Sequence, residues 1–262
     1  MNMDYNYHTH TYRCGHANGT PEEYVRRAIE GGIKHMGFSD HAPHVFSDGH
    51  ESGFRVPMAE ASDYVCEVLE LREKYKDDID IKVGFEMEYY PSQFQRMLHV
   101  VRELGAEYLI LGQHFIGEEY PSGLYMFRPT ETEAHICEYV DNCIEGMRSG
   151  YFSYLAHPDL ANFVGDESIY VREMTRLCTA SRELDIPLEI NFLGIRTGRH
   201  YPAEKFWRIA SSCGSPVTFG FDAHDAMAAA DTDSLTVALG LVAKYDLNYI
   251  SKPKIIDIQT RG

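Results

Sequence analysis

Residues 4–16 read DYNYHTHTYRCGH, and the fold of the chain is organised around how this segment ends. A short strand over residues 4–7 is predicted to deliver His8 and His10 into a loop that also holds His16. Alternate residues of an extended chain point to the same side, so the first two imidazoles can reach one metal ion. One H-x-H pair is weak evidence for a metal site. Its meaning depends on what the later strands carry at their ends.

Strand and helix patterns alternate along the rest of the chain. Apolar runs that predict strands end near residues 40, 86, 114, 157, 191 and 222, and helical patterns lie between them. The run YLIL at 108–111 is continuously apolar, as expected for a parallel strand covered on both faces. About seven strand–helix units in strict alternation predict a parallel sheet, either doubly wound or closed into a barrel.

Residues of the types that bind metals decide between these two folds. Each candidate lies at or just beyond the C-terminal end of a predicted strand: His8, His10, His41, Glu86, His114, His157, Asp222 and His224. In a barrel these ends form one ring around a common mouth, whereas the outer strands of an open sheet could not converge on one site. We therefore expect an α/β, TIM-barrel-like fold. Residues 1–262 show no linker or internal repeat, so a single domain is expected.

The composition narrows the classes of partner. The 24 Lys and Arg against 40 Asp and Glu give a formal net charge of -16, which argues against a nucleic acid or a membrane surface bound through a basic face. No window approaches the roughly 20 apolar residues of a membrane span, and the first residues lack the features of a secretion signal. We therefore expect a cytoplasmic protein with reduced cysteines. Cys14 is interpreted as an ordinary loop residue rather than a ligand.

The candidate ligands exceed what one metal ion needs. A mononuclear zinc site takes three protein ligands and a water, whereas nine donors, with His16 included, suggest two or three ions with Glu86 bridging a pair. Imidazole together with carboxylate favours Zn, Mn or Fe over Mg. Two such ions about 3.5–4 Å apart can share a hydroxide as nucleophile and neutralise phosphoryl oxygens. These residues predict a multinuclear metallohydrolase.

An amidohydrolase stays open at this point, because that class also begins with H-x-H on its first strand. In amidohydrolase barrels a lysine typically ends the middle strand and bridges the ions. Here no lysine ends a predicted strand, and Glu86 takes the bridging position. This difference favours phosphoester hydrolysis.

Seven ordered motifs resemble the PHP (polymerase and histidinol phosphatase) family, in its histidinol-phosphate phosphatase branch. They are HTHTYRCGH (8–16), FSDHAP (38–43), GFEMEYYP (84–91), GQHF (112–115), AHPDL (156–160), EIN-FLGIR (189–196) and FDAHD (221–225). The resemblance covers nearly the whole chain and implies a distorted (β/α)7 barrel with three divalent ions, Zn, Mn or Fe. It implies one ion on His8, His10, Glu86 and Asp222, a second on His16, His41 and His224, and a third on Glu86, His114 and His157.

The resemblance also implies an activity, that of a metal-dependent phosphomonoesterase. The expected reaction is hydrolysis of L-histidinol phosphate to L-histidinol and phosphate, in histidine biosynthesis, with a metal-bridging hydroxide as nucleophile. Two departures keep a nucleotide, sugar phosphate or phosphodiester open as substrate. Gly112-Gln113-His114 is one residue shorter than the GSVH of the branch, and Asn162 and Phe163 stand where a basic residue commonly follows H-x-D-L. A catalytically silent metal-binding module is the remaining alternative.

Candidates for substrate contact lie in loops. Arg196 is predicted to clamp the phosphate, because a guanidinium matches phosphate oxygens bidentately, and Arg199 is a weaker candidate. His44, in the long loop 42–57, could contact an imidazole-bearing substrate or protonate the leaving alkoxide. The predicted catalytic residues are Arg196, His44, Glu86, Asp222 and His224, and Arg199 is predicted only to contact the phosphate. The expected partner is a small phosphate ester, bound by a monomer or small homo-oligomer.

Two further carboxylates stand next to candidate ligands. Asp40 could orient His41 or its neighbours as an outer carboxylate. Glu88 is expected to pack in the core rather than to shape the pocket.

Overall fold

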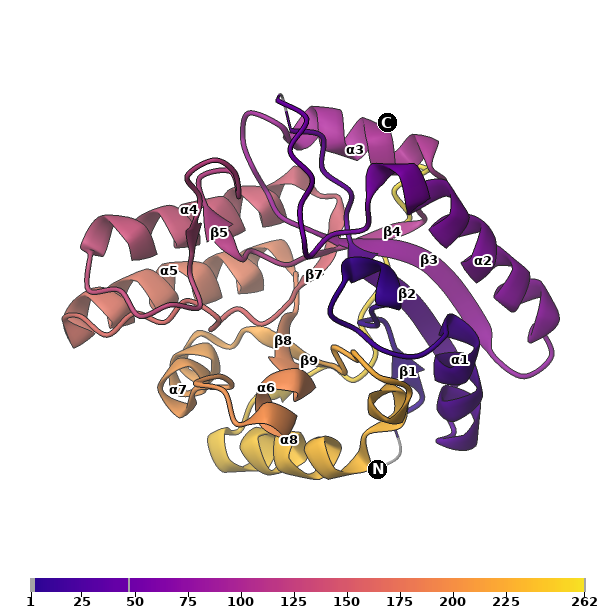
Figure 1. The fold of residues 1–262 in the computed structure, drawn as a ribbon. Coiled ribbons are helices and arrows are strands. Elements are labelled where there is room, and N and C mark those ends of the chain that lie inside the picture. Colours follow the sequence, from indigo (N-terminus) through magenta and orange to yellow (C-terminus); the bar gives the residue numbers. More distant parts are fainter. Residues whose placement is uncertain (1–2, 47, 262) are drawn as a thin grey trace.

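Strands curl into a ring at the centre of the molecule, with helices around the outside (Figure 1). The computed structural model describes residues 3–46 and 48–261. Within these residues, eight parallel strands form one sheet in the order β1-β2-β3-β4-β7-β8-β9-β10. They are β1 (Tyr5–Asn6), β2 (His35–His41), β3 (Asp80–Met87), β4 (Tyr108–Leu111), β7 (Phe152–Leu155), β8 (Leu188–Asn191), β9 (Pro216–Gly220) and β10 (Asn248–Tyr249).

The helices follow the strands in the alternation expected from the sequence. They are α1 (Pro21–Glu30), α2 (Ala61–Lys74), α3 (Phe94–Glu103), α4 (Glu133–Ser149), α5 (Glu167–Leu184), α6 (Phe192–Thr197), α7 (Glu204–Cys213) and α8 (Thr232–Tyr245). Short 3-10 helices are η1 (Tyr12–Cys14), η2 (Met58–Glu60) and η3 (Ala226–Ala230). Helix α1 begins with a capping box, in which Thr20 and Glu23 bond reciprocally to each other's backbone N–H. No helix in the described ranges has the length and apolar character needed to cross a membrane.

The sheet closes on itself at the mouth of the barrel. Beyond the ends of β1 and β9, Thr9 pairs in parallel with Ala223. His10 N donates to Ala223 O at 3.0 Å, and Ala223 N donates to His8 O at 3.1 Å. The predicted barrel is therefore confirmed. An eighth strand, β10, was not expected and pairs with the first residues of β9.

A buried tyrosine fills the interior beneath the mouth. The Tyr108 ring lies over the backbones of β2 and β3, where a Cβ on Gly37 or Gly84 would overlap it. Its hydroxyl donates to Tyr7 O at 2.9 Å, so the polar end of this side chain is satisfied. The space below the mouth is thus packed core, as in other barrels of this kind.

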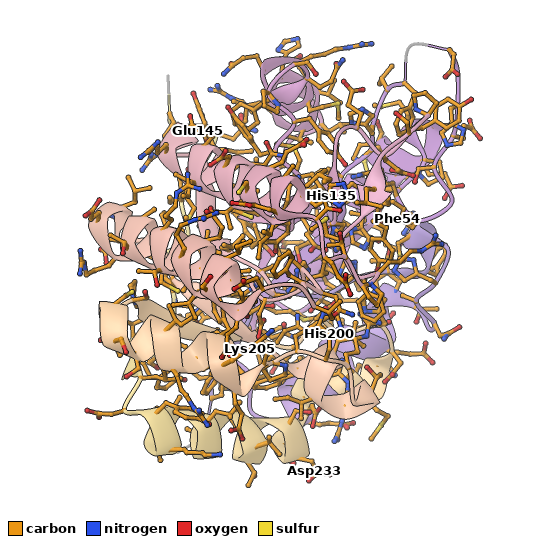
Figure 2. All side chains as sticks on the ribbon, turned by 90° about the vertical axis from the view of Figure 1, so that its left-hand side faces the viewer. Phe54, His135, Glu145, His200, Lys205 and Asp233 are labelled. Atoms are coloured by element: carbon orange, nitrogen blue, oxygen red, sulfur yellow. The ribbon has the colours of Figure 1, made fainter. Side chains whose placement is uncertain are left out.

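Two segments predicted as loops contain regular structure. The ribbon of β5 (Phe115–Ile116) and β6 (Leu124–Tyr125) is antiparallel. Most of it falls in residues 116–129, which are rich in Gly, Pro and Tyr and are predicted to form a loop. Helix α6 follows β8 directly, with the Asn191 side chain accepting from Gly194 N as the N-cap. Figure 2 shows Phe54, His135 and His200 towards one end of the barrel, whereas Glu145, late in α4, lies towards the other.

Candidate metal centre

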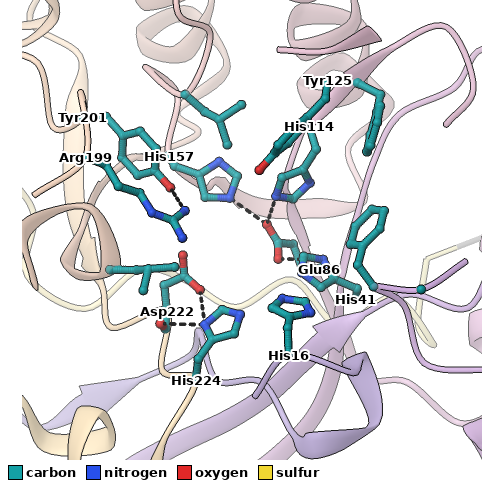
Figure 3. Close-up of a pocket in the computed structure, with 15 residues that line it drawn as sticks. His16, His41, Glu86, His114, Tyr125, His157, Arg199, Tyr201, Asp222 and His224 are labelled. Atoms are coloured by element: carbon teal, nitrogen blue, oxygen red, sulfur yellow. Dashed lines mark hydrogen bonds and ion pairs between the residues drawn. The ribbon is translucent and has the colours of Figure 1, made fainter. Parts of the chain in front are cut away.

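Ligand-type side chains converge on a cavity of about 580 Å³ at the mouth of the barrel (Figure 3). Seven of the nine predicted ligands line this cavity: His16, His41, Glu86, His114, His157, Asp222 and His224. The other two, His8 and His10, lie beneath them and are fully buried. The structure therefore brings all nine predicted residues together.

Four donor atoms on the floor surround one point. His8 Nε2 lies 3.4 Å from Glu86 Oε2 and 3.6 Å from Asp222 Oδ1. His10 Nε2 lies 3.4 Å from the same Glu86 oxygen and 3.2 Å from the same Asp222 oxygen. Ligands at 2.0–2.2 Å from a tetrahedral ion lie roughly 3.3–3.6 Å from one another, so this spacing fits a metal ion.

The bonding state of these atoms supports the same conclusion. His8 Nε2, His10 Nε2 and Asp222 Oδ1 are buried and have no hydrogen-bond partner. Buried polar atoms without partners are rare in folded proteins. A cation at their common centre would satisfy all three, so the residues present fit a divalent ion of the kind that the donor set favours.

Two further clusters adjoin the first. His16, His41 and His224 place donor atoms within 4.8 Å of one another. On the other side, Glu86 Oε1 lies 2.8 Å from His157 Nε2 and 3.6 Å from His114 Nε2. The two oxygens of Glu86 thus face different clusters, as a bridging carboxylate would. The assignment of each residue to a particular ion stays a prediction.

Buried carboxylates behind the floor orient its histidines. His8 Nδ1 donates to Glu189 Oε2 at 2.8 Å, and His10 Nδ1 lies 3.4 Å from Asp40 Oδ1. Such contacts fix which ring nitrogen faces the metal. Asp40 accepts from the backbone N of His41 and from Thr11 N. The imidazole that it faces is that of His10 and not that of His41, and Asp40 and the His10 ring make no hydrogen bond. Glu189 was not predicted, although it is the one charged residue in the otherwise uncharged strand LEIN.

Glu88 has the same role for His114. His114 Nδ1 donates to Glu88 Oε1 at 2.9 Å, and Arg55 Nη1 lies 2.6 Å from Glu88 Oε2. Burial alone would raise the pKa of Glu88, but the charges of Arg55 and His114 lower it to about 2. Glu88 is buried and does not line the cavity, as expected, but its contacts with His114 and Arg55 were not predicted.

The electrostatics of the cavity favour bound cations. Burial lowers the pKa of His8, yet Glu189, Asp222 and Glu86 together raise it to about 10. These carboxylates therefore favour a positive charge at this ring, which a metal ion would supply in place of the proton. Burial, together with the charges of His224 and His10, lowers the pKa of His16 to about 4. At neutral pH His16 is uncharged and available as a ligand.

Two of the predicted ligands have a strained backbone. His157 and Asp222 have φ of 29° and 45°, in the left-handed region that non-glycine residues rarely adopt. Each such residue costs on the order of 1–3 kcal/mol and persists where the surroundings enforce it. Arg196 holds the backbone at Asp222 in place, because its Nη2 donates to the carbonyls of Phe221 and Asp222 at 3.0 and 2.9 Å.

Of the three predicted substrate contacts, the structure places one at the cavity and two away from it. Arg196 directs Nη1 to Asp231 Oδ2 at 3.0 Å and does not line the cavity, so its predicted role as a direct phosphate clamp is corrected to support of Asp222. Arg199 does line the cavity, with Nη1 donating to the Tyr201 hydroxyl at 2.7 Å. His44 lies beside a separate cavity of about 190 Å³, so the structure does not place it near a leaving group.

An aromatic wall was not predicted. Phe54, Phe115, Tyr125 and Tyr201 line the cavity together with Leu160 and Leu193. They come from loops and short elements. For Phe54 and Tyr125, the only signal in the sequence is the aromatic content of segments 42–57 and 116–129.

Comparison with known proteins gives consistent matches. A model of the PHP domain matches residues 6–192. The chain is 25% identical to a probable histidinol-phosphatase of Deinococcus radiodurans, over 83% of this chain and 85% of that protein. It is 27% identical to the histidinol-phosphatase of Bacillus subtilis, over 84% of this chain and 92% of that protein.

A solved structure has the same fold. It is the histidinol phosphate phosphatase from Lactococcus lactis, complexed with zinc, L-histidinol and phosphate, and it matches with a TM-score of 0.71. The match covers 98% of this chain and 97% of that protein, at 21% sequence identity. At this identity the likeness concerns the fold, and the chemistry must be argued from the residues of this chain.

Proposed function

Because the chain belongs to the PHP domain family, we propose that it is a metal-dependent phosphomonoesterase that hydrolyses L-histidinol phosphate to L-histidinol and phosphate. The observation that carries the proposal is the arrangement around Glu86, whose two oxygens face two different ligand clusters. Support for the substrate comes from the two histidinol-phosphatases that match over most of their length and from the relative that binds L-histidinol and phosphate.

Three divalent ions, zinc, manganese or iron, would be held by the nine ligands. Such ions supply a nucleophilic water at neutral pH and neutralise the charge on phosphoryl oxygens. The residues of the chain fix the geometry: Glu189 and Glu88 set the ring nitrogens that face the centre, and Arg196 holds the backbone of Asp222. This preorganised charge is what a phosphoryl transfer site requires.

The cavity walls suit the two ends of the proposed substrate. Arg199 places a guanidinium at the cavity beside Asp222 (Figure 3), where it can bind phosphate oxygens. Phe54 and Tyr125 offer ring faces and edges against which an imidazole can pack. The phosphate would therefore lie at the metals and Arg199, with the ring of the substrate along the aromatic wall.

The experiment is a metal analysis combined with a substrate panel. We expect three ions per purified chain and phosphate release from L-histidinol phosphate faster than from sugar phosphates, nucleotides or a phosphodiester. Fewer than two ions per chain would exclude the multinuclear centre. Poor release from L-histidinol phosphate with good release from another ester would support the second candidate function, a PHP-type phosphoesterase of different specificity.

Two other predictions are tested in the same preparations. If the wild-type protein is active and His10→Ala abolishes that activity, a catalytically silent metal-binding module is excluded. The His10 side chain is suited to this test because it is buried on the floor among the donor atoms. A cytoplasmic location and a monomeric or small homo-oligomeric state stay predictions, to be checked by cell fractionation and by light scattering.

A further inference from the structure

Arg55 is a buried arginine in the loop 42–57, of which residue 47 lies outside the described residues. Only 3% of its surface is exposed. Its Nη1 lies 2.6 Å from Glu88 Oε2, its Nε lies 2.7 Å from Glu119 Oε2, and its Nη2 donates to the Tyr90 hydroxyl at 3.4 Å. Burying a guanidinium is costly unless its partners are well placed, and removing one partner leaves an uncompensated charge. These contacts therefore fix the loop firmly against the strand end at Glu88.

One of these partners leads directly to a metal-ligand residue. Glu88 accepts from His114 Nδ1 through its other oxygen, at 2.9 Å. This contact leaves His114 Nε2 as the free ring nitrogen, 3.6 Å from Glu86 Oε1. Arg55, Glu88 and His114 thus form a continuous chain of contacts from a rim loop to the bridging carboxylate.

The loop that Arg55 anchors is also part of the cavity wall. Phe54, next to it in sequence, lines the cavity and has its ring centroid 5.0 Å from that of His41 and 6.0 Å from that of His114. On the other side of Arg55, Val56 N donates to His41 O at 3.1 Å. Both sequence neighbours of Arg55 therefore contact metal-ligand residues.

A second loop meets the first at the same place. Glu119, which bonds Arg55, precedes Tyr120, whose ring stacks on that of His50 at 3.9 Å between centroids. Loop 42–57 and the segment around residues 117–121 are thereby joined to each other as well as to Glu88. Arg55, itself in the first loop, thus contacts both the second loop and the strand end.

We propose that Arg55 is a positioning residue that couples the two rim loops to the filling of the third metal position, formed by Glu86, His114 and His157. The inference rests on the three-metal centre of the proposed function. When Arg55 is replaced, Glu88 loses its strongest partner and the loop loses its anchor. The His114 ring is then no longer held with Nε2 towards Glu86, and the ion at that position binds more weakly.

The test compares Arg55→Met and Arg55→Lys with a matched control. Arg72→Met removes another arginine–glutamate contact, 2.8 Å to Glu107, which precedes β4 at the opposite end of the barrel. Ions per chain are counted by mass spectrometry after gel filtration in metal-free buffer, folding is checked by circular dichroism, and kcat and KM are measured with and without added metal.

We expect Arg55→Met to retain two ions and the control to retain three. The kcat of Arg55→Met should fall by about 10–100-fold, which is the usual effect of losing an outer partner of a metal ligand. Added metal should restore most of the loss, and KM should change less than kcat. Arg55→Lys keeps the charge but not the forked geometry, so its metal affinity should lie between those of the wild type and Arg55→Met.

A folded Arg55→Met protein with three ions and unchanged kcat would overturn the inference. If Arg55→Met does not fold, Glu88→Gln interrupts the same chain of contacts at its next member. Three ions retained in both Glu88→Gln and Arg55→Lys would then overturn the inference. The metal count needs no substrate, so an error in the substrate assignment leaves this test intact. A wild-type chain with fewer than three ions would instead overturn the three-metal centre itself, and the inference with it.

Discussion

The floor and the rim of the cavity are built by different means. On the floor, His8 and His10 are fully buried, follow a paired strand, and have carboxylates such as Glu189 behind their rings. At the rim, Phe54 and Arg199 come from irregular segments and are held by contacts between side chains. The difference teaches that metal binding and substrate choice are separable. Changes to the floor should remove ions, whereas changes to the rim side chains that line the cavity should alter KM with the metal content intact. Arg55 lies in a rim loop but bonds Glu88, so in this respect it belongs with the floor.

The largest effect is expected at Glu86, where the floor joins the other two clusters. Glu86→Gln keeps the shape of the side chain but replaces the bridging charge with a neutral amide. We expect loss of at least one ion per chain and a fall in kcat/KM of about a thousandfold or more, because the ligands act as a unit. Metal analysis and steady-state kinetics on the same sample measure both.

The comparison would break if this variant kept three ions and lost activity only through KM. A control for Glu86→Gln must change a residue away from the cavity. Gln113→Glu does not meet this condition, because the Gln113 side chain accepts from Tyr89 N near the site. Glu107→Gln is better matched. Glu107 is also a carboxylate at a strand and accepts a backbone N–H, from Val83, but it lies before the start of β4, at the end of the barrel opposite the cavity. It should retain three ions and wild-type kinetics.

A smaller effect is expected one layer further from the metals, at Glu189. Glu189→Gln removes the charged acceptor of His8 Nδ1 while preserving the volume of a fully buried side chain. Metal affinity or kcat should fall by about 10–100-fold. Competition with a fluorescent chelator gives the affinity, and wild-type affinity in a folded variant would show that Glu189 does not orient His8.

At the rim, Arg199→Met should weaken substrate binding without removing ions. The lost charge-assisted contact to phosphate is worth roughly 1.5–3 kcal/mol, or about 10–100-fold in KM. Inorganic phosphate should inhibit the variant correspondingly less.

Arg196→Met provides the contrast to Arg199→Met. The Arg196 guanidinium bonds the backbone near Asp222, so its loss should lower kcat. Equal effects of both variants on KM would contradict the placement of these two arginines.

The floor could be predicted because strand periodicity and barrel topology determine it. Once His8, Glu86 and Asp222 are recognised at strand ends, closure of the sheet brings them together regardless of loop structure. The two-residue strands β5, β6 and β10 were missed, since so short a stretch carries no periodic pattern. Their pairing is set by tertiary contacts that no local pattern records.

The rim could not be predicted in the same way. Arg196 and Arg199 are three residues apart, and which of them reaches the cavity depends on helix α6 and the turn at Gly198, which has a φ of 63°. That helix begins immediately after a strand, in a segment whose glycines indicate a loop. Arg55 gave no signal either, because its importance arises from Glu88 and Glu119 on distant segments.

The smallest expected effect concerns Phe54 and would sharpen the role of the aromatic wall. Phe54→Leu removes ring contact at the cavity while keeping an apolar side chain. An aromatic pair contributes about 0.5–1.5 kcal/mol beyond area burial, so KM for L-histidinol phosphate should rise about two- to tenfold. KM for glycerol phosphate, which has no ring, should stay unchanged, as should the three ions. An equal rise for both esters would mean that Phe54 supports the phosphate end, and the separation of the wall from the metal floor would then fail at this residue.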